Sequence, residues 1–269
     1  MPIIIGSGIV LGEPAGVLPL DHPRIMYDDI VNAATLTPST EETGFEAVNI
    51  ADYLTWDFWK PTALPATLEI ESLAAADVDY ALIAAHNLGT VGASISIDYW
   101  DGAAWVEIVS EVSPGNDSVL AFLFTSVTSN KFRLNVSGGA TMPSVGVFML
   151  GTALAVERKL YKQHTPITLG RRTLIRPQSS EAGQWLGRSI QRDGVATTIT
   201  FNNLTSAWVR ASLDPFIVAA RTRAFGWAWR PADYPAEVAY CQAVGDINPV
   251  NSGPRDFMSV SFKVEGLVD

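Results

Sequence analysis

Three histidines, one cysteine and a few neighbouring carboxylates are the side chains with which this sequence could perform chemistry. His22, His86 and His164 lie far apart, and none has a second histidine or cysteine at zinc-ligand spacing. Cys241 is the only cysteine, so it can form neither an intrachain disulfide nor a cysteine-rich metal centre. We therefore expect no bound metal and no other cofactor.

The carboxylate pairs are poorly placed for catalysis. Asp28-Asp29 and Glu41-Glu42 are adjacent residues, and neighbours in an extended chain point to opposite faces, so the members of a pair are badly oriented to share one site. Ser7 lies between two glycines without the flanking pattern of a nucleophile elbow. Gly138-Gly139 is not followed by the helix and lysine of a phosphate-binding loop. The sequence predicts no catalytic residues and a protein that is not an enzyme.

Two pairs of residues are candidates for binding a glycan. His86-Asn87 follows an apolar run, and a histidine beside an asparagine at a strand end can bind a sugar or a cation. These side chains can instead hydrogen-bond the backbone of a turn, which is the interpretation we favour. Trp100-Asp101 precedes Gly102 at the tip of a predicted hairpin, where an exposed indole could stack on a sugar ring. The candidate glycan-binding residues are therefore Trp100, Asp101, His86 and Asn87.

Charge is divided unevenly along the chain. The net charge is −10, yet residues 1–150 carry four basic against 18 acidic residues, and residues 151–269 carry 14 basic against 10 acidic. Arg221, Arg223 and Arg230 lie beside an aromatic strand in the basic half, and arginine and aromatic residues are enriched at protein interfaces. We expect these three arginines to contact carboxylates of an adjacent copy or another partner. With no Lys/Arg run longer than Arg171-Arg172, we expect no specific nucleic-acid binding.

The composition predicts a folded protein. Hydrophobic residues make up 48% of the chain and charged residues 17%, so enough apolar surface exists to build a core. No apolar run approaches the roughly 20 residues that a membrane-spanning helix needs. The first residues lack the basic region and long apolar stretch of a secretion signal, and we expect neither a membrane span nor export.

The residue pattern changes twice along the chain. Residues 1–48 are rich in proline and glycine without helical periodicity, and predict an extended N-terminal arm. Residues 49–151 alternate between apolar and polar side chains in several short runs, which predicts a β-sandwich. Residues 152–269 predict further strands and one helix over 205–223, broken or restarted at Pro215 with Asp214 as its N-cap. We expect a sheet with that helix packed on it.

Several motifs within residues 49–151 resemble a known family. They are Asp57-Phe58-Trp59-Lys60-Pro61, Ala85-His86-Asn87-Leu88-Gly89, Asp101-Gly102 followed by Trp105, and Lys131-Phe132-Arg133-Leu134. Together they resemble the discoidin-like, or galactose-binding-like, β-sandwich carried by tail proteins of tailed bacteriophages. The resemblance implies a jelly-roll sandwich with His86-Asn87 in a hairpin between core strands.

The remainder of the chain resembles another phage family through the order of its elements. Ile190-Gln191-Arg192, Phe201-Asn202-Asn203-Leu204, a helix and Phe225-Gly226-Trp227 follow one another as in tail-tube and distal tail proteins. The two resemblances imply a mainly β protein: a discoidin-like jelly-roll sandwich plus a tail-tube-like β domain with one helix.

The function implied is that of a structural component of a bacteriophage tail. As a minor tail or distal tail protein, the chain would form a homo-oligomeric ring between the tail tube and the tip, with tube and hub proteins as partners. Its location would be the virion, after assembly in the host cytoplasm. The alternative is a carbohydrate-binding module or adhesin that contacts a host surface glycan through residues 49–151. An enzyme is the third and least favoured interpretation.

Overall fold

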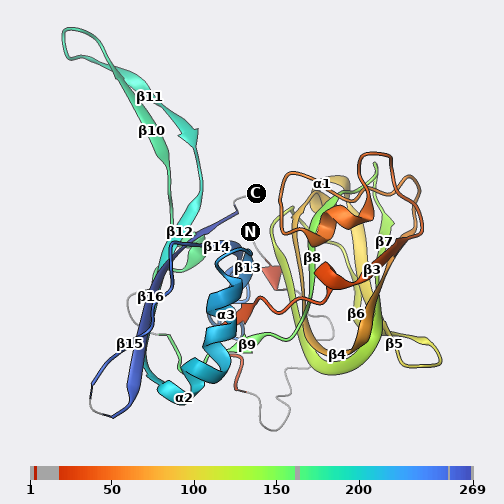
Figure 1. Ribbon diagram of the computed structural model, residues 1–269. Coiled ribbons are helices and arrows are strands. Elements are labelled where there is room, and N and C mark those ends of the chain that lie inside the picture. Colours follow the sequence, from red (N-terminus) through yellow and green to blue (C-terminus); the bar gives the residue numbers. More distant parts are fainter. Residues whose placement is uncertain (1–2, 5–17, 161–163, 254, 268–269) are drawn as a thin grey trace.

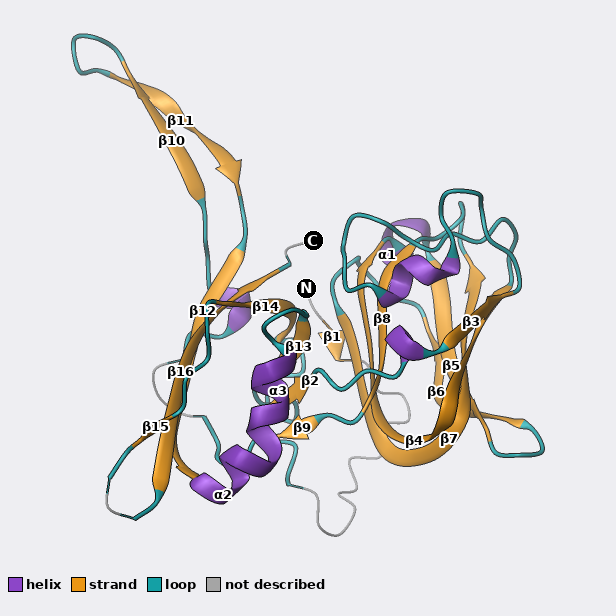
Figure 2. Ribbon diagram, viewed as in Figure 1, coloured by secondary structure: helices purple, strands orange, loops and turns teal. Residues whose placement is uncertain are grey.

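The computed structural model describes residues 3–4, 18–160, 164–253 and 255–267. Within these ranges the chain is mainly β, as the sequence predicted. A β-sandwich lies beside a second sheet that carries a helical segment, and a two-stranded hairpin projects from this second sheet (Figures 1 and 2). We call the two compact parts the sandwich module and the helical module.

The sandwich module is built around two unusually long strands. Its strands are β1 (Ile3–Ile4), β3 (Thr35–Pro38), β4 (Ala66–His86), β5 (Ala93–Trp100), β6 (Trp105–Val112), β7 (Leu120–Gly138) and β8 (Val145–Gly151). The first part of β4 pairs with the end of β7, and the last part of β4 pairs with the start of β7. Because both strands bend between these two parts, they belong to both layers of the sandwich (Figure 2).

The bend in β4 coincides with a change in its side-chain pattern. Residues up to Ile70 alternate between buried and exposed, as in a sheet with one wet face, whereas residues 72–77 are outside the core. The pairing with β7 shifts register between Glu71 and Ala76, which is how a bulge bends a strand. Beyond the bend, residues 80–84 are buried on both faces, as the apolar run 79–85 predicted.

The hairpin predicted around Gly102 is confirmed. β5 and β6 are antiparallel, with Trp100 opposite Trp105. Gly102 has a φ of 104°, a conformation open to glycine but strained for other residues. In this sheet the strands are neighbours in the order β3, β4, β7, β5, β6. We call the layer that these strands form on the side away from the helical module the outer layer (Figure 1).

The helical module is an antiparallel sheet covered on one face by a helical segment. Its strands are β2 (Arg24–Met26), β9 (Leu154–Ala155), β12 (Val195–Thr205), β13 (Phe225–Ala228), β14 (Val238–Val244), β15 (Val250–Asn251) and β16 (Phe257–Gly266). The helical segment is α2 (Ser206–Trp208), η4 (Val209–Leu213) and α3 (Asp214–Ala219). Leu213 and Phe216 of this segment pack with Phe225 and Trp227 of β13 in one buried cluster.

The predicted helix is present, but its start differs from the prediction. The N-cap is Thr205, whose hydroxyl accepts the Trp208 N–H at 3.4 Å. Asp214 has helical angles and lies inside the segment instead of capping it. The turn before Pro215 is a π-helical turn, and a wider turn accommodates a residue that lacks an N–H and whose ring crowds the preceding turn.

The N-terminal region predicted as an extended arm contributes strands to both modules. β2 lies between β13 and β9 of the helical module, and β3 forms an edge of the sandwich next to β4. Residues 1–2 and 5–17 of that predicted arm lie outside the described residues. The short 3-10 helices η1 (Val31–Ala33) and η2 (Ala47–Ala51) complete this part of the sandwich module.

A two-stranded hairpin, which the sequence did not predict, projects from the molecule. β10 (Leu174–Ser179) and β11 (Trp185–Arg192) pair with each other and with no other described strand. In Figure 1 this hairpin extends away from both modules. We call residues 171–192 the projecting hairpin.

The two modules meet along a shared apolar layer. On the sandwich side it contains Tyr80, Leu82, Ala121 and Met149, and on the helical side Met26, Ala228, Val238 and Tyr240. Gly226 faces this layer, because a Cβ there would lie 2.3 Å from a methyl carbon of Leu82 and 2.8 Å from Cε of Met26. A hydrogen bond of 2.8 Å from the Tyr240 hydroxyl to the Tyr53 carbonyl lies at the same junction.

Substitution of Gly226 tests how tightly this layer is packed. Since an added methyl group would displace buried side chains from both modules, Gly226→Ala should lower the free energy of unfolding by roughly 1–3 kcal/mol. Gly115→Ala is the matched control, because no atom lies within 4 Å of its added Cβ. Urea unfolding of both variants measures the difference; equal stabilities would show that the layer is loosely packed.

Candidate functional site

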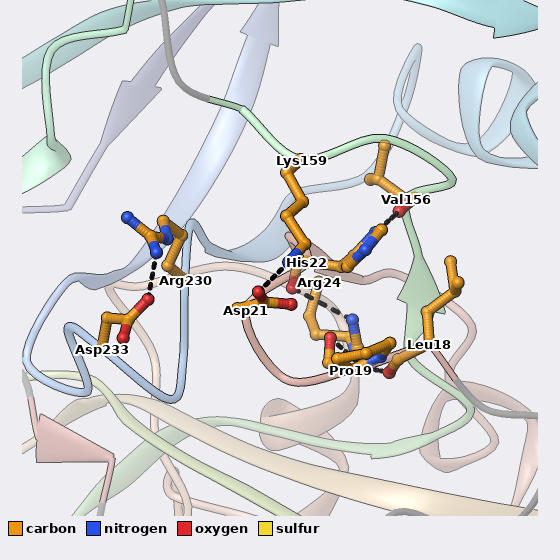
Figure 3. A network of polar contacts seen from close by, with 9 residues as sticks. All are labelled: Leu18, Pro19, Asp21, His22, Arg24, Val156, Lys159, Arg230 and Asp233. Atoms are coloured by element: carbon orange, nitrogen blue, oxygen red, sulfur yellow. Dashed lines mark hydrogen bonds and ion pairs between the residues drawn. The ribbon is translucent and has the colours of Figure 1, made fainter.

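A network of polar contacts in the helical module joins residues 18–24 to the segment that leaves the sandwich (Figure 3). The Arg24 guanidinium donates to the carbonyl oxygens of His22 at 3.0 Å and Pro19 at 3.2 Å. The His22 Nδ1 lies 2.8 Å from the Val156 carbonyl, which accepts its proton. Asp21 forms an ion pair with Lys159. These contacts join residues 18–24 to residues 156–159.

This network has a structural role. Its arginine and imidazole donate to backbone carbonyls of the same chain, which would otherwise be unsatisfied in this buried loop. The hydrogen bond from Lys159 lowers the pKa of Asp21 and so favours the charged carboxylate. Arg230, one of the three arginines expected at an interface, lies beside this network in an ion pair with Asp233.

The other two interface candidates lie elsewhere in the helical module. Arg221 and Arg223 are exposed residues that follow α3. The Arg223 guanidinium lies 5.5 Å from the ring centroid of Tyr53 in the sandwich module. The structure thus places Arg223 at the junction between modules and Arg230 beyond β13, and it does not gather the three arginines into one patch.

His86 and Asn87 are used by the turn that follows β4. The His86 Nε2 lies 2.9 Å from the Ser118 carbonyl, and the Leu88 N–H donates to Nδ1 at 3.3 Å. The Asn87 side-chain oxygen accepts the Ser144 N–H at 2.7 Å. Both side chains therefore satisfy backbone groups of neighbouring loops.

Trp100 and Asp101 lie at the opposite end of β5 from His86 and Asn87. The Asp101 carboxylate accepts the N–H groups of Ala103 and Ala104, both at 2.8 Å, and these bonds lower its pKa. Trp100 packs edge-on against Trp105, with ring centroids 5.5 Å apart. Since β5 separates the two pairs, the four candidate residues do not form one site.

A cleft between the modules brings together groups that the sequence did not connect. Its volume is about 370 Å³, and its lining residues include Tyr53, Trp56, Arg172, Asp193, Gln242 and Glu265. The Trp56 side chain is 72% exposed. Arg172, at the base of the projecting hairpin, forms an ion pair with Glu265 of β16. The sequence marks Trp56 as one of several tryptophans, but only the packing of the modules places it beside these polar groups.

Of the remaining reactive side chains, Cys241 is buried in the core of the helical module and His164 is half-buried. Burial raises the pKa of the Cys241 thiol to about 12, which disfavours the thiolate. Burial lowers the pKa of His164 to about 4, and its ring lies 5.1 Å from that of Trp229. Among the described residues, no three histidine, cysteine or acidic side chains are grouped as metal ligands.

Two carboxylates at the module junction have raised pKa values. Burial raises the pKa of Asp29 to about 6, although the N–H groups of Val31 and Leu150 donate to it. Burial likewise raises the pKa of Asp79 to about 6, against the opposing effect of a 2.7 Å hydrogen bond from the Ala153 N–H. Both side chains fix backbone segments where the modules meet.

Comparisons with known proteins give structural similarities only. No family model matches the sequence, and no curated protein matches it. A pectin-binding carbohydrate-binding module is 20% identical, with a TM-score of 0.40 over 46% of this chain and 92% of that chain. The family 32 carbohydrate-binding module of C. perfringens NanJ, solved with galactose, is 18% identical, with a TM-score of 0.41 over 46% of this chain and 97% of that chain.

A third similar structure comes from another bacterium. Chitosan-binding module 1 of a Paenibacillus sp. IK-5 chitosanase/glucanase is 17% identical, with a TM-score of 0.40 over 46% of this chain and 98% of that chain. At these similarities, none of the three structures indicates what the present chain binds. Within the described part of the chain, no helix has the length and apolar character needed to span a membrane.

The junction carboxylates predict how stability depends on pH. An unfolded aspartate loses its proton near pH 4, whereas folded Asp79 keeps it until about pH 6, so raising the pH through this window favours unfolding. Asp79→Asn should remove up to about 3 kcal/mol of this decline. The free energy of unfolding at pH 4, 5, 6 and 7 measures this difference, with Asp246→Asn at an exposed position as the control. Identical pH slopes for wild type and Asp79→Asn would contradict the assignment.

Proposed function

We propose that the protein binds a saccharide in the cleft beside Trp56. The observation that carries the proposal is an exposed indole that lines a cleft of about 370 Å³ together with carboxylate, guanidinium and amide groups. A cavity of this size with a few convergent polar groups is typical of a ligand site. The carbohydrate ligands named for the similar structures belong to those proteins, and the proposal rests on the cleft.

The ligand class follows from the chemistry of the lining. The face of an indole packs against the C–H face of a sugar ring, while the ring hydroxyls need donors and acceptors around their edge. Gln242 supplies both, Asp193 and Glu265 accept, and Arg172 donates. Arg172 and Glu265 form an ion pair, and Asp193 leaves the lining with a net charge of −1. This charge disfavours an anionic sugar and favours a neutral saccharide.

Removal of the indole tests this function. Trp56→Ala should weaken saccharide binding about tenfold or more, because the stacking surface is lost. Trp100→Ala is a matched control, since it removes a tryptophan that the sequence favoured but that lies outside the cleft. A glycan array with the full chain would identify the ligand, and titration calorimetry would then compare the variants.

Two results would contradict the proposal. One is a wild-type chain that binds no member of the array. The other is a loss of binding in Trp100→Ala while Trp56→Ala binds normally, which would move the site to the β5–β6 hairpin.

A structural subunit of a larger assembly is the second candidate function. The projecting hairpin favours it, because exposed strands of this kind serve as contacts between subunits. The bacteriophage tail, the ring between tube and tip and the virion location stay predictions, since no structure named above is a tail protein. The absence of catalytic activity also stays a prediction.

A further inference from the structure

The projecting hairpin exposes more apolar surface than an isolated hairpin in water can sustain. Every described side chain of β10 and β11 is exposed. The large apolar side chains among them are Leu174, Ile175, Trp185, Leu186 and Ile190. A two-stranded hairpin alone is at best marginally stable, and a contiguous exposed apolar patch marks an interaction surface.

The strand pairing gathers much of this apolar surface on one face. Ile175 pairs with Ile190, and Ser179 pairs with Trp185; paired residues share a face, as do residues two apart in a strand. Ile175, Pro177 and Ile190 therefore lie on the same face. The pairing shifts register between Gln178 and Ser179, and beyond this shift the pairing of Trp185 with Ser179 brings its side chain, which is 82% exposed, to the same face. Arg188, opposite Pro177, lies between them on this face.

The projecting hairpin is also the basic part of the molecule. Residues 171–192 contain five arginines and a single carboxylate, Glu181, for a net charge of +4. This equals the net charge of residues 151–269 as a whole. A partner for the hairpin should therefore present an acidic surface with some apolar or aromatic area.

The outer layer of the sandwich has such a surface. Its solvent-facing side carries the charged residues Glu69, Glu71, Asp98, Glu107, Glu111, Lys131 and Arg133. Lys131 pairs with Glu71, and Arg133 pairs with Asp98, which leaves three further glutamates and a net charge of −3. We call this side the acidic face.

The acidic face also has aromatic area and regular geometry. Glu69 lies opposite Arg133, Arg133 opposite Asp98, and Asp98 opposite Glu107, so these charges form one row across the strands. The Arg133 guanidinium lies 4.4 Å from the ring centroid of Trp105, which is next to this row.

The hairpin cannot cover the acidic face of its own chain. The helical module packs on the opposite layer of the sandwich, through Tyr80, Leu82 and Met149. In Figure 1 the outer layer with β3, β5 and β6 lies on the far side of the molecule from the projecting hairpin. Two different surfaces on opposite sides of one molecule generate head-to-tail contacts, and hence a ring or a filament.

We infer that the projecting hairpin docks on the acidic face of a second copy of this chain. Arg188, which shares a face with Ile175 and Ile190, would meet the charged row that contains Glu69 and Glu107. The apolar side chains of Ile175, Ile190 and Trp185 would be covered by the neighbouring sheet. Arg176, opposite Ser189, lies on the other face of the hairpin and adds to the positive charge that the acidic face attracts. Arg172 at the base of the hairpin lines the saccharide cleft, but the residues of β10 and β11 proposed for this contact do not. The inference is therefore independent of the proposed function.

Charge reversal on the two surfaces tests the inference. Wild type should associate with rising concentration in sedimentation velocity, and less so at high salt. Arg176→Glu with Arg188→Glu, or Glu69→Lys with Glu107→Lys, should weaken association at least about tenfold. Mixing these two double variants should produce heterodimers, because one retains the acidic face and the other retains the hairpin. All four changes in one chain should restore association.

Two controls keep the test specific. Arg255→Glu with Lys263→Glu makes the same change in net charge at exposed positions outside the hairpin and should associate like wild type. Hydrogen exchange at residues 174–191 should slow in concentrated protein, a readout that needs no variant to fold.

Several outcomes would overturn the inference. They are a wild-type chain that stays monomeric at all concentrations, reversed variants that associate like wild type, a mixture that gives no heterodimer, and hairpin amides that exchange equally fast at high and low concentration. A loss of association in Arg221→Glu with Arg223→Glu, but not in the hairpin variant, would transfer the interface to the arginines after α3.

Discussion

The structure depends on one layer of sheet that is buried on both faces. In the last part of β4, Ala81 and Ile83 belong to the core of the sandwich, while Tyr80, Leu82 and Ala84 belong to the layer between the modules. In a strand, adjacent side chains point to opposite faces, so neither set can be buried without a partner on its own side. The sandwich thus needs the helical module to cover β4, β7 and β8.

The helical module also contains strands whose two faces must both be covered. Phe225 and Trp227 of β13 pack beneath the helical segment, whereas Ala228, Val238 and Tyr240 are buried at the junction. Because β13 and the last part of β4 are covered on both sides, the two modules form one packed body. Their fixed relation shapes the cleft beside Trp56, and it holds the projecting hairpin and the acidic face on opposite sides.

The local pattern of apolar and polar residues predicted strands of the sandwich. Alternating residues indicate a strand with one buried face, and a continuous apolar run indicates a strand buried on both faces. The run 79–85 indicated a strand covered on both faces, and Asp101-Gly102 indicated the turn between β5 and β6. The projecting hairpin was not predicted, because both of its faces are exposed to solvent. Burial therefore does not impose a regular alternation of apolar and polar residues on its sequence. The cap at Thr205 was missed because Asp214-Pro215 is the stronger local signal for a helix start.

Sites that depend on tertiary packing were beyond sequence reasoning. Trp56 and Glu265 are distant in sequence and share a cleft only because the modules pack together. His86 and Trp100 are close in sequence, yet β5 carries them to opposite ends of the sandwich. The sequence identified residue types suited to sugar binding, and the fold decided which of them lie side by side.

Differential scanning calorimetry of the full chain tests the central claim most directly. If the doubly buried layer joins the two modules into one cooperative unit, the chain will unfold in one transition whose calorimetric and van't Hoff enthalpies agree. Two separate transitions, one for each module, would show that each sheet is stable without the other and would contradict this account.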